Sequence, residues 1–225
     1  MSKKQKKSKK ARSHDEKEEK ELEEDTEEEK EGRHEEDPID PFGALLSSME
    51  KPDLRTIGLF GEVNEERAAE LIIGMIMMCE EGEVEEKKPL KFYLSTYGGN
   101  ADDMFALYDM MNYVKAKGYE IQTIGLGKVM SAGVLLLSGG TQGKRKIGKH
   151  CRVMIHACNA GNMGDIYNLQ NEMEAIHDLQ EKYSNAIVEN TSLTKRQLKK
   201  LLERKVNIYL TADEAIEYGI ADEII

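Results

Sequence analysis

One serine in this sequence stands where such a residue can do nucleophilic chemistry. Ser131 lies in the segment Gly-Leu-Gly-Lys-Val-Met-Ser-Ala-Gly, where an expected strand turns into a short apolar helix. This geometry exposes the hydroxyl and places backbone N–H groups at a helix N-terminus, which favours a developing negative charge. A serine before a helix is also a common N-cap, and the segment does not match the Gly-x-Ser-x-Gly pattern. The segment alone leaves both roles open.

A histidine near the end of another expected strand, residues 151–157, is the candidate general base. A lone histidine at such a position, as His156 is, is more often a hydrogen-bonded core residue than a base. Cys158 and His150 lie close in sequence, so a metal site and a thiol nucleophile at Cys158 are alternatives. Zinc needs four ligands, and the nearest acidic residue, Asp165, follows a glycine-containing loop. We therefore expect no metal at this histidine.

A glycine pair ends a third apolar strand, expected at residues 90–95. Backbone N–H groups freed at such a strand end can face a ligand, as an oxyanion hole requires. Gly98 and Gly99 are therefore candidates for this role. A tight turn is the other interpretation of a Gly-Gly pair.

The elements that must position these residues alternate along the chain. We expect strands at 55–60, 90–95, 120–126, 151–157, 207–210 and 220–225. We expect helices at 64–80, 101–117, 165–190 and 194–204, with shorter ones within 127–140 and after Thr211. This alternation predicts an α/β fold with a largely parallel sheet. Apolar residues at helical spacing predict the buried face of the 101–117 helix: Met104, Leu107, Tyr108, Met111 and Val114.

The first forty residues differ in composition from the rest. Seven of the ten residues from Lys3 to Arg12 are Lys or Arg, and acidic residues dominate from Asp15 to Asp37. Such a stretch cannot bury enough apolar surface to offset its ordering entropy, so residues 1–40 are expected to be a disordered charged tail. Residues 41–225 are expected to form one domain, beginning with a short amphipathic arm at 42–49.

Several function classes are excluded by composition. The basic run is short and adjoins an acidic block, so it does not indicate nucleic-acid binding. No apolar region of a signal peptide follows it, and no stretch of about 20 apolar residues predicts a membrane span. The three cysteines form no even framework, which indicates a reducing compartment. We expect the cytoplasm of a bacterium, or of a host infected by a phage.

From Arg55 to Ile225 the sequence resembles the proteolytic subunit of the Clp protease family. The segments that carry the resemblance include Gly98-Gly99-Asn100, Met130-Ser131-Ala132-Gly133, Arg152-Val153-Met154-Ile155-His156 and Leu210-Thr211-Ala212. The resemblance implies a Clp protease- and crotonase-like spiral of βαβ units with a handle helix, here within 157–190. It implies a serine endopeptidase in which Ser131 is the nucleophile and His156 is the base. It also implies an oxyanion hole made by the backbone N–H groups of Gly99 and Ala132.

The resemblance also implies how the protein works with others. The substrates are unfolded polypeptides, bound in extended form near Gly98 and Asn159. An AAA+ unfoldase partner uses the ATP, since this chain has no Walker A motif, and Tyr93 matches a position in the family's docking cleft. The expected assembly is a homo-oligomer of two heptameric rings, a tetradecamer. Neither a metal nor an organic cofactor is implied.

The chain departs from the family where the triad should be completed. Asn207 stands where the family usually has Asp. Asparagine can accept the imidazole N–H, but it cannot stabilise the imidazolium by charge, so we expect a slow or conditionally active triad. Glu203 is a conceivable substitute and Asp213, at a helix start, a poor one. Tyr97 and the segment 157–159 also depart, and both touch the substrate-binding edge.

Three alternative functions remain open at this point. Asn207 favours a near-inactive structural ring subunit that assembles with an active paralogue. An acyl-CoA enzyme of the crotonase class shares the spiral fold and a backbone oxyanion hole. A non-catalytic binding module that uses the charged tail is the third alternative.

Overall fold

The computed structural model describes residues 55–80, 87–203 and 206–225. The tail expected at 1–40 and the arm expected at 42–49 lie outside the described residues. None of the helices in the described ranges is long and apolar enough to cross a membrane.

The described strands form one sheet with the order β1-β2-β3-β4-β7, and β5 joins it by pairing with β3 and β6. Every pairing is parallel except that of β5 with β6. This arrangement confirms the predicted α/β fold with a largely parallel sheet. The strands are β1 (Thr56–Val63), β2 (Leu90–Gly99), β3 (Ile121–Met130), β4 (Lys146–Ile147), β5 (Arg152–Ile155), β6 (Ile208–Leu210) and β7 (Glu223–Ile224).

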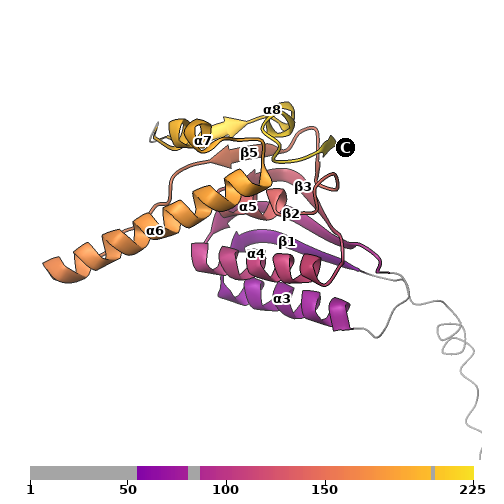
Figure 1. Cartoon of the computed structure of the whole chain (residues 1–225), viewed down its shortest axis with the longest axis horizontal. Helices are drawn as coiled ribbons and strands as arrows, with labels where there is room; N and C mark the ends of the chain where they lie inside the picture. The colour runs from indigo at the N-terminus through magenta and orange to yellow at the C-terminus, as the bar shows by residue number, and fades with distance from the viewer. Residues whose placement is uncertain (1–54, 81–86, 204–205) are drawn as a thin grey trace, which may run out of the picture. The chain divides into compact units, whose positions relative to one another are not determined.

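Two helices begin at the capping residues that the sequence predicts. Asn64 accepts from the Arg67 N–H at 3.0 Å, and Thr211 forms a capping box with Glu214. Figure 1 shows that α6 extends far beyond the body of the domain, as expected of the handle helix. The helices are α3 (Glu65–Glu80), α4 (Ala101–Ala116), α5 (Ala132–Ser138), α6 (Ile166–Asn190), α7 (Lys195–Leu202) and α8 (Ala212–Glu217).

The core lies around α5, which is buried along its whole length. Helix α5 packs against β2 and β3 and touches α4 and α6. Gly133 permits this close packing, because a Cβ there would lie 2.5 Å from a methyl carbon of Thr96. The face predicted for α4 is buried as expected, through Met104, Leu107, Tyr108, Met111 and Val114. A rigid, fully packed helix therefore begins directly after Ser131.

The strand expected to end at Leu126 is longer in the structure. It continues through Gly127, whose φ of 65° suits glycine, and ends at Met130. The pairing of β2 with β3 shifts between Leu94 and Thr96, and this irregularity lets the second half of β3 stay in the sheet. That half also pairs with β5. The sequence-based boundary was wrong because Gly127 continues the strand instead of ending it.

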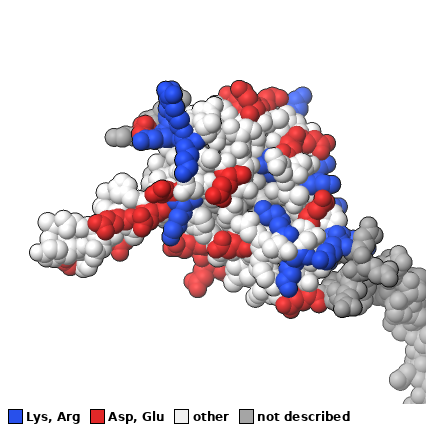
Figure 2. Space-filling model, viewed as in Figure 1, with Lys and Arg blue, Asp and Glu red and all other residues white. Residues whose placement is uncertain are grey.

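The outer part of α6 carries apolar side chains into solvent. Ile166, Tyr167 and Met173 are all more than half exposed. In Figure 2 the projecting end of this helix is largely uncharged, with acidic side chains along one edge further in. An exposed apolar surface of this kind is typical of a surface that contacts another protein.

Candidate active site

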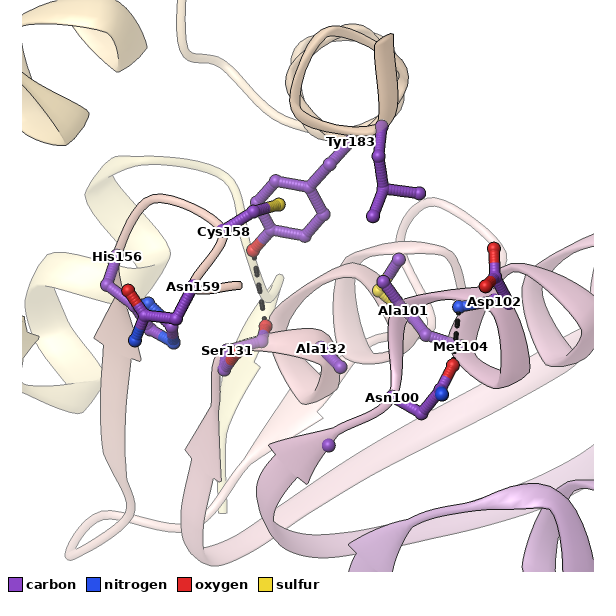
Figure 3. Close-up of a pocket in the computed structure, with 12 residues that line it drawn as sticks. Asn100, Ala101, Asp102, Met104, Ser131, Ala132, His156, Cys158, Asn159 and Tyr183 are labelled. Atoms are coloured by element: carbon purple, nitrogen blue, oxygen red, sulfur yellow. Dashed lines mark hydrogen bonds between the residues drawn. The ribbon is translucent and has the colours of Figure 1, made fainter. Parts of the chain in front are cut away.

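A pocket of about 340 Å³ brings together most of the residues predicted to do chemistry. It lies where β2 ends, where β3 passes into α5, and beside the loop that follows β5 (Figure 3). Gly98 and Asn207 are not among its lining residues. The lining consists of Gly99, Asn100, Ala101, Asp102, Met104, Ser131, Ala132, His156, Cys158, Asn159, Leu179 and Tyr183.

Ser131 has a strained backbone at the junction of β3 and α5. Its φ of 54° makes it the one non-glycine residue with positive φ in the described part of the chain. Its N–H donates to the Met154 carbonyl at 2.8 Å, which fixes the junction to β5. Ser131 occupies the N-cap position of α5, but its side chain makes no capping hydrogen bond there. Strain of this kind is typical of functional positions.

Gly98 supports the serine from the neighbouring strand. It is buried with a φ of 96°, and a Cβ there would lie 2.6 Å from the Ser131 Cβ and 2.8 Å from the Met130 carbonyl oxygen. The Gly98 N–H donates to the Thr96 hydroxyl oxygen at 2.9 Å. Gly98 therefore packs behind the pocket, and its exposed neighbour Gly99 lines it.

The two residues predicted to form an oxyanion hole both face the pocket. Gly99 must be glycine, because a Cβ would lie 2.1 Å from the Val63 carbonyl oxygen. The N–H of the next residue, Asn100, donates to that same oxygen at 2.8 Å and ties the strand end to β1. Ala132 is the first residue of α5, and the first N–H groups of a helix have no partner within the helix. Gly99 and Ala132 thus come from two elements and line the same pocket as Ser131.

His156 is half-buried at the pocket, directly after β5 ends. Its Nδ1 lies 2.5 Å from the carbonyl oxygen of Ala157. A carbonyl oxygen can only accept, so this contact puts the imidazole proton on Nδ1 and leaves Nε2 as an acceptor. A general base for a serine hydroxyl needs this tautomer.

Asn207 does not line the pocket that holds His156. The pairing of Ile155 with Ile208 makes His156 and Asn207 the next pair along the β5–β6 ladder, but the ladder stops before them. Asn207 is exposed and lines a separate hollow with Met154 and Tyr209. No hydrogen bond joins it to His156 in the described chain, because the ring bonds instead to the carbonyl that follows it.

Comparison with known proteins decides the family. The model of the Clp protease family, described as "Clp protease", matches residues 43–225. The chain belongs to the Clp protease family. It is 32% identical over 170 residues to the "ATP-dependent Clp protease proteolytic subunit" of Oltmannsiellopsis viridis, covering 76% of this chain and 83% of that one. It is 30% identical over 189 residues to "ATP-dependent Clp protease proteolytic subunit 2" of Bifidobacterium longum (strain NCC 2705), covering 84% of each.

Membership of the Clp protease family confirms the serine-type peptidase class predicted from the sequence. The competing chemistries find little support in the geometry. Burial raises the pKa of the Cys158 thiol, which disfavours the thiolate that a cysteine nucleophile needs. His150 is exposed and does not line the pocket. Within residues 55–80, 87–203 and 206–225, no group of three His, Cys, Asp or Glu residues is placed to hold a metal ion.

The two carboxylates weighed as substitutes for Asn207 do not line the pocket either. Glu203 lies at the exposed end of α7, where it pairs with Lys199 at 3.6 Å. Asp213 lies in the first turn of α8, as predicted.

One residue of this Clp protease site had no sequence signal. Tyr183, from α6, is buried and donates its hydroxyl to the Ser131 carbonyl oxygen at 3.2 Å, a contact drawn in Figure 3. Burial raises the pKa of Tyr183, so the hydroxyl stays a donor. The periodicity of α6 predicts that such a residue faces the core, but not that it reaches a backbone 52 residues away.

Proposed function

We propose that this chain is the serine endopeptidase subunit of an ATP-dependent Clp-type protease ring, which hydrolyses unfolded polypeptides to short peptides. The observation that carries the proposal is the pocket in which strained Ser131 stands beside His156 and the backbone N–H groups of Gly99 and Ala132.

The proposed mechanism is acyl transfer through Ser131. Nε2 of His156 takes the hydroxyl proton as Oγ attacks the peptide carbonyl carbon. The oxyanion is stabilised by the N–H groups of Gly99 and Ala132. His156 then gives its proton to the leaving amine, and the C–N bond breaks. A water molecule, deprotonated by His156, attacks the acyl-serine and releases the second product.

Asn207 is proposed as the third member of the triad. Extending the β5–β6 ladder by one pair would place it opposite His156, because the register already aligns the two residues. Its side-chain oxygen would then replace the Ala157 carbonyl as acceptor of the imidazole proton. A neutral acceptor stabilises the imidazolium less than a carboxylate does, so the site is expected to be slow.

Substrate is proposed to bind as an extended strand between Gly99 and Asn159. Both residues are exposed and line the pocket, and the segment around Asn159 has no regular structure that would occupy its backbone groups. An edge of this kind binds an added strand through main-chain hydrogen bonds. The peptide-binding role predicted for Gly98 passes to its neighbour, since the Gly98 N–H is already bonded.

An AAA+ unfoldase and further copies of this chain are the proposed partners. The relatives are named as ATP-dependent proteolytic subunits, and an unfoldase would supply that ATP use. The exposed apolar side chains of α6 support contact between two heptameric rings in a tetradecamer. The free thiols of Cys79, Cys151 and Cys158 support a cytoplasmic location.

A near-inactive ring subunit is the second candidate. The bond of the His156 ring to Ala157, in place of Asn207, favours it, because an unaligned triad hydrolyses slowly. Peptide hydrolysis by the purified chain, alone and mixed with an active paralogue, distinguishes the two candidates. Activity of the chain alone supports the first, and activity only in the mixture supports the second.

The test of the proposed function is labelling with a serine-directed fluorophosphonate. Ser131→Ala is expected to abolish labelling and to lower peptide hydrolysis by at least about 10⁴-fold. Ser184→Ala is the matched control, since Ser184 bonds within α6 and does not line the pocket, and it should label normally. Labelling that persists in Ser131→Ala would exclude Ser131 as the nucleophile.

A further inference from the structure

The pocket beside Ser131 has an apolar wall and one fixed negative charge. Met104, Leu179 and the ring of Tyr183 form the wall away from the reacting atoms. Asp102 is the sole acidic residue among the lining residues, and no Lys or Arg lines the pocket. In Figure 3 Asp102 lies on the side of the pocket opposite His156, with Ser131 and Ala132 between them.

The backbone of Asp102 is held in place while its carboxylate stays available. Asn100 caps α4 and accepts from the N–H groups of Asp102 and Asp103 at 2.8 and 3.1 Å. The Asp102 carboxylate makes no hydrogen bond or ion pair with any residue that the structure describes. The helix dipole at the start of α4 favours an acidic residue at both position 102 and position 103. It does not account for why only Asp102 lines the pocket.

We infer that Asp102 makes this pocket prefer Lys or Arg in the substrate residue before the scissile bond. This inference rests on the proposed function, since it concerns the side chain next to the carbonyl that Ser131 attacks. The methylene stem of such a side chain packs along Met104 and Leu179, and its cationic end meets the carboxylate. An all-apolar side chain fills the same wall but leaves the carboxylate without a partner.

Two opposing effects set the size of the preference. The N-terminus of α4 carries a partial positive charge of about half a unit, which weakens the attraction for a cation. The full charge of Asp102, which lines the pocket, exceeds this partial charge. Asp102 is solvent-exposed in the free protein, so the ion pair is expected to change selectivity by about three- to fivefold.

The test compares two N-acylated fluorogenic peptides that differ only in lysine or norleucine before the scissile bond. Acylation removes the α-amine, so a preference must come from the side chain. The ratio of the two kcat/KM values is measured for the full chain, for Asp102→Asn and for the control Asp103→Asn. Asp102→Asn is expected to lower the lysine-to-norleucine ratio about three- to fivefold, while Asp103→Asn keeps it. A second readout is the rate at which diphenyl phosphonates with the same two side chains label Ser131.

The outcomes separate this inference from the proposed function. A ratio that falls in Asp102→Asn alone, and falls less at high salt, supports the inference. Labelling and hydrolysis with a ratio unchanged in Asp102→Asn overturn the inference and leave the peptidase intact. An equal fall of the ratio in both variants also overturns the inference. Such a fall indicates a long-range electrostatic effect of either carboxylate and no specific contact with Asp102. Failure of both probes to react at Ser131 overturns the proposed function and the inference together.

Discussion

Ser131 stands on the packed centre of the sheet, whereas His156 lies just past the point where a strand ends. The serine is flanked by a fully buried helix, a glycine that excludes any side chain, and hydrogen bonds to Met154 and Tyr183. The histidine is held by one bond to the adjacent Ala157 carbonyl. These two regions are the serine side and the histidine side of the site.

The difference shows which part of the chemistry the fold determines by itself. Stabilisation of an oxyanion by backbone N–H donors needs a rigid backbone, and the serine side provides one. In the proposed triad, one more pair in the β5–β6 ladder would bring Asn207 opposite His156, so a small change at the strand end would decide whether the base is aligned. We therefore expect Asn207, in place of the Asp that the resemblance implies, to weaken the histidine side and to leave the serine side unchanged.

Gly98→Ala is expected to have the largest effect on stability. It combines a positive φ with a clash against Ser131, and should lower the free energy of unfolding by about 3–4 kcal/mol. Gly143→Ala is the control, because Gly143 has a φ of 82° and no atom within 4 Å of the added Cβ. It should cost about 1 kcal/mol. Urea unfolding measures both, and equal losses would show that the serine side is not tightly packed.

Asp222→Asn should destabilise the packing that holds the ends of α5 and α6 together. Asp222 pairs with buried Arg145, which also donates to the carbonyls of Ser138, at the end of α5, and Asn190, at the end of α6. Removing the charge leaves a buried guanidinium underpaired, with an expected loss of about 2–3 kcal/mol at pH 7. Lys199→Ala, which breaks the exposed pair with Glu203, should change stability by less than about 0.5 kcal/mol.

The effect of Asp222→Asn should depend on pH. Burial acts to raise the pKa of Asp222, but hydrogen bonds from Arg145 and Gly143 outweigh it and lower that pKa below the ordinary value of 3.8. A carboxyl group whose pKa is lowered by folding stabilises the protein at pH values above its unfolded-state pKa. This stabilisation is lost as the pH falls through the folded-state pKa. The difference between the two proteins in unfolding experiments should therefore shrink below pH 3.8. A difference independent of pH would contradict this account.

Tyr183→Phe removes one hydrogen bond from the serine side and keeps the ring. We expect kcat to fall about tenfold with KM little changed, because the Ser131 carbonyl loses one of the donors that hold its strained backbone. Tyr167→Phe, on the exposed part of the same helix, should keep both constants. A rise in KM alone would indicate that Tyr183 acts only as a wall of the pocket.

Asn207→Ala should have the smallest effect, confined to the histidine side. In dissociated subunits we expect the His156 ring to keep the bond to Ala157 that the structure shows, so Ser131 labelling should slow less than twofold. In assembled rings, where Asn207 is proposed to align the base, it should slow about fivefold. Asn207→Asp should raise hydrolysis in the rings. Native mass analysis identifies the assembly, and equal slowing in both states would remove the link between assembly and alignment.

The sequence predicted the serine side better than the histidine side. Ser131, Gly99 and Ala132 belong to short motifs whose local geometry follows from the residues themselves. Whether Asn207 meets His156 depends on where the β5–β6 ladder stops, which side-chain patterns do not define. Tyr183 escaped prediction for a related reason, because its contact with Ser131 joins segments far apart in the chain. Gly127 misled the prediction of β3, since glycine both ends strands and permits bulges.

The most direct test is a crystal structure of the protein after reaction with a phosphonate that labels serine. The account predicts phosphorus bonded to Ser131 Oγ. It also predicts one phosphonyl oxygen about 2.7–3.1 Å from the backbone nitrogens of both Gly99 and Ala132. An adduct on another residue, or a phosphonyl oxygen turned away from those two nitrogens, would contradict it.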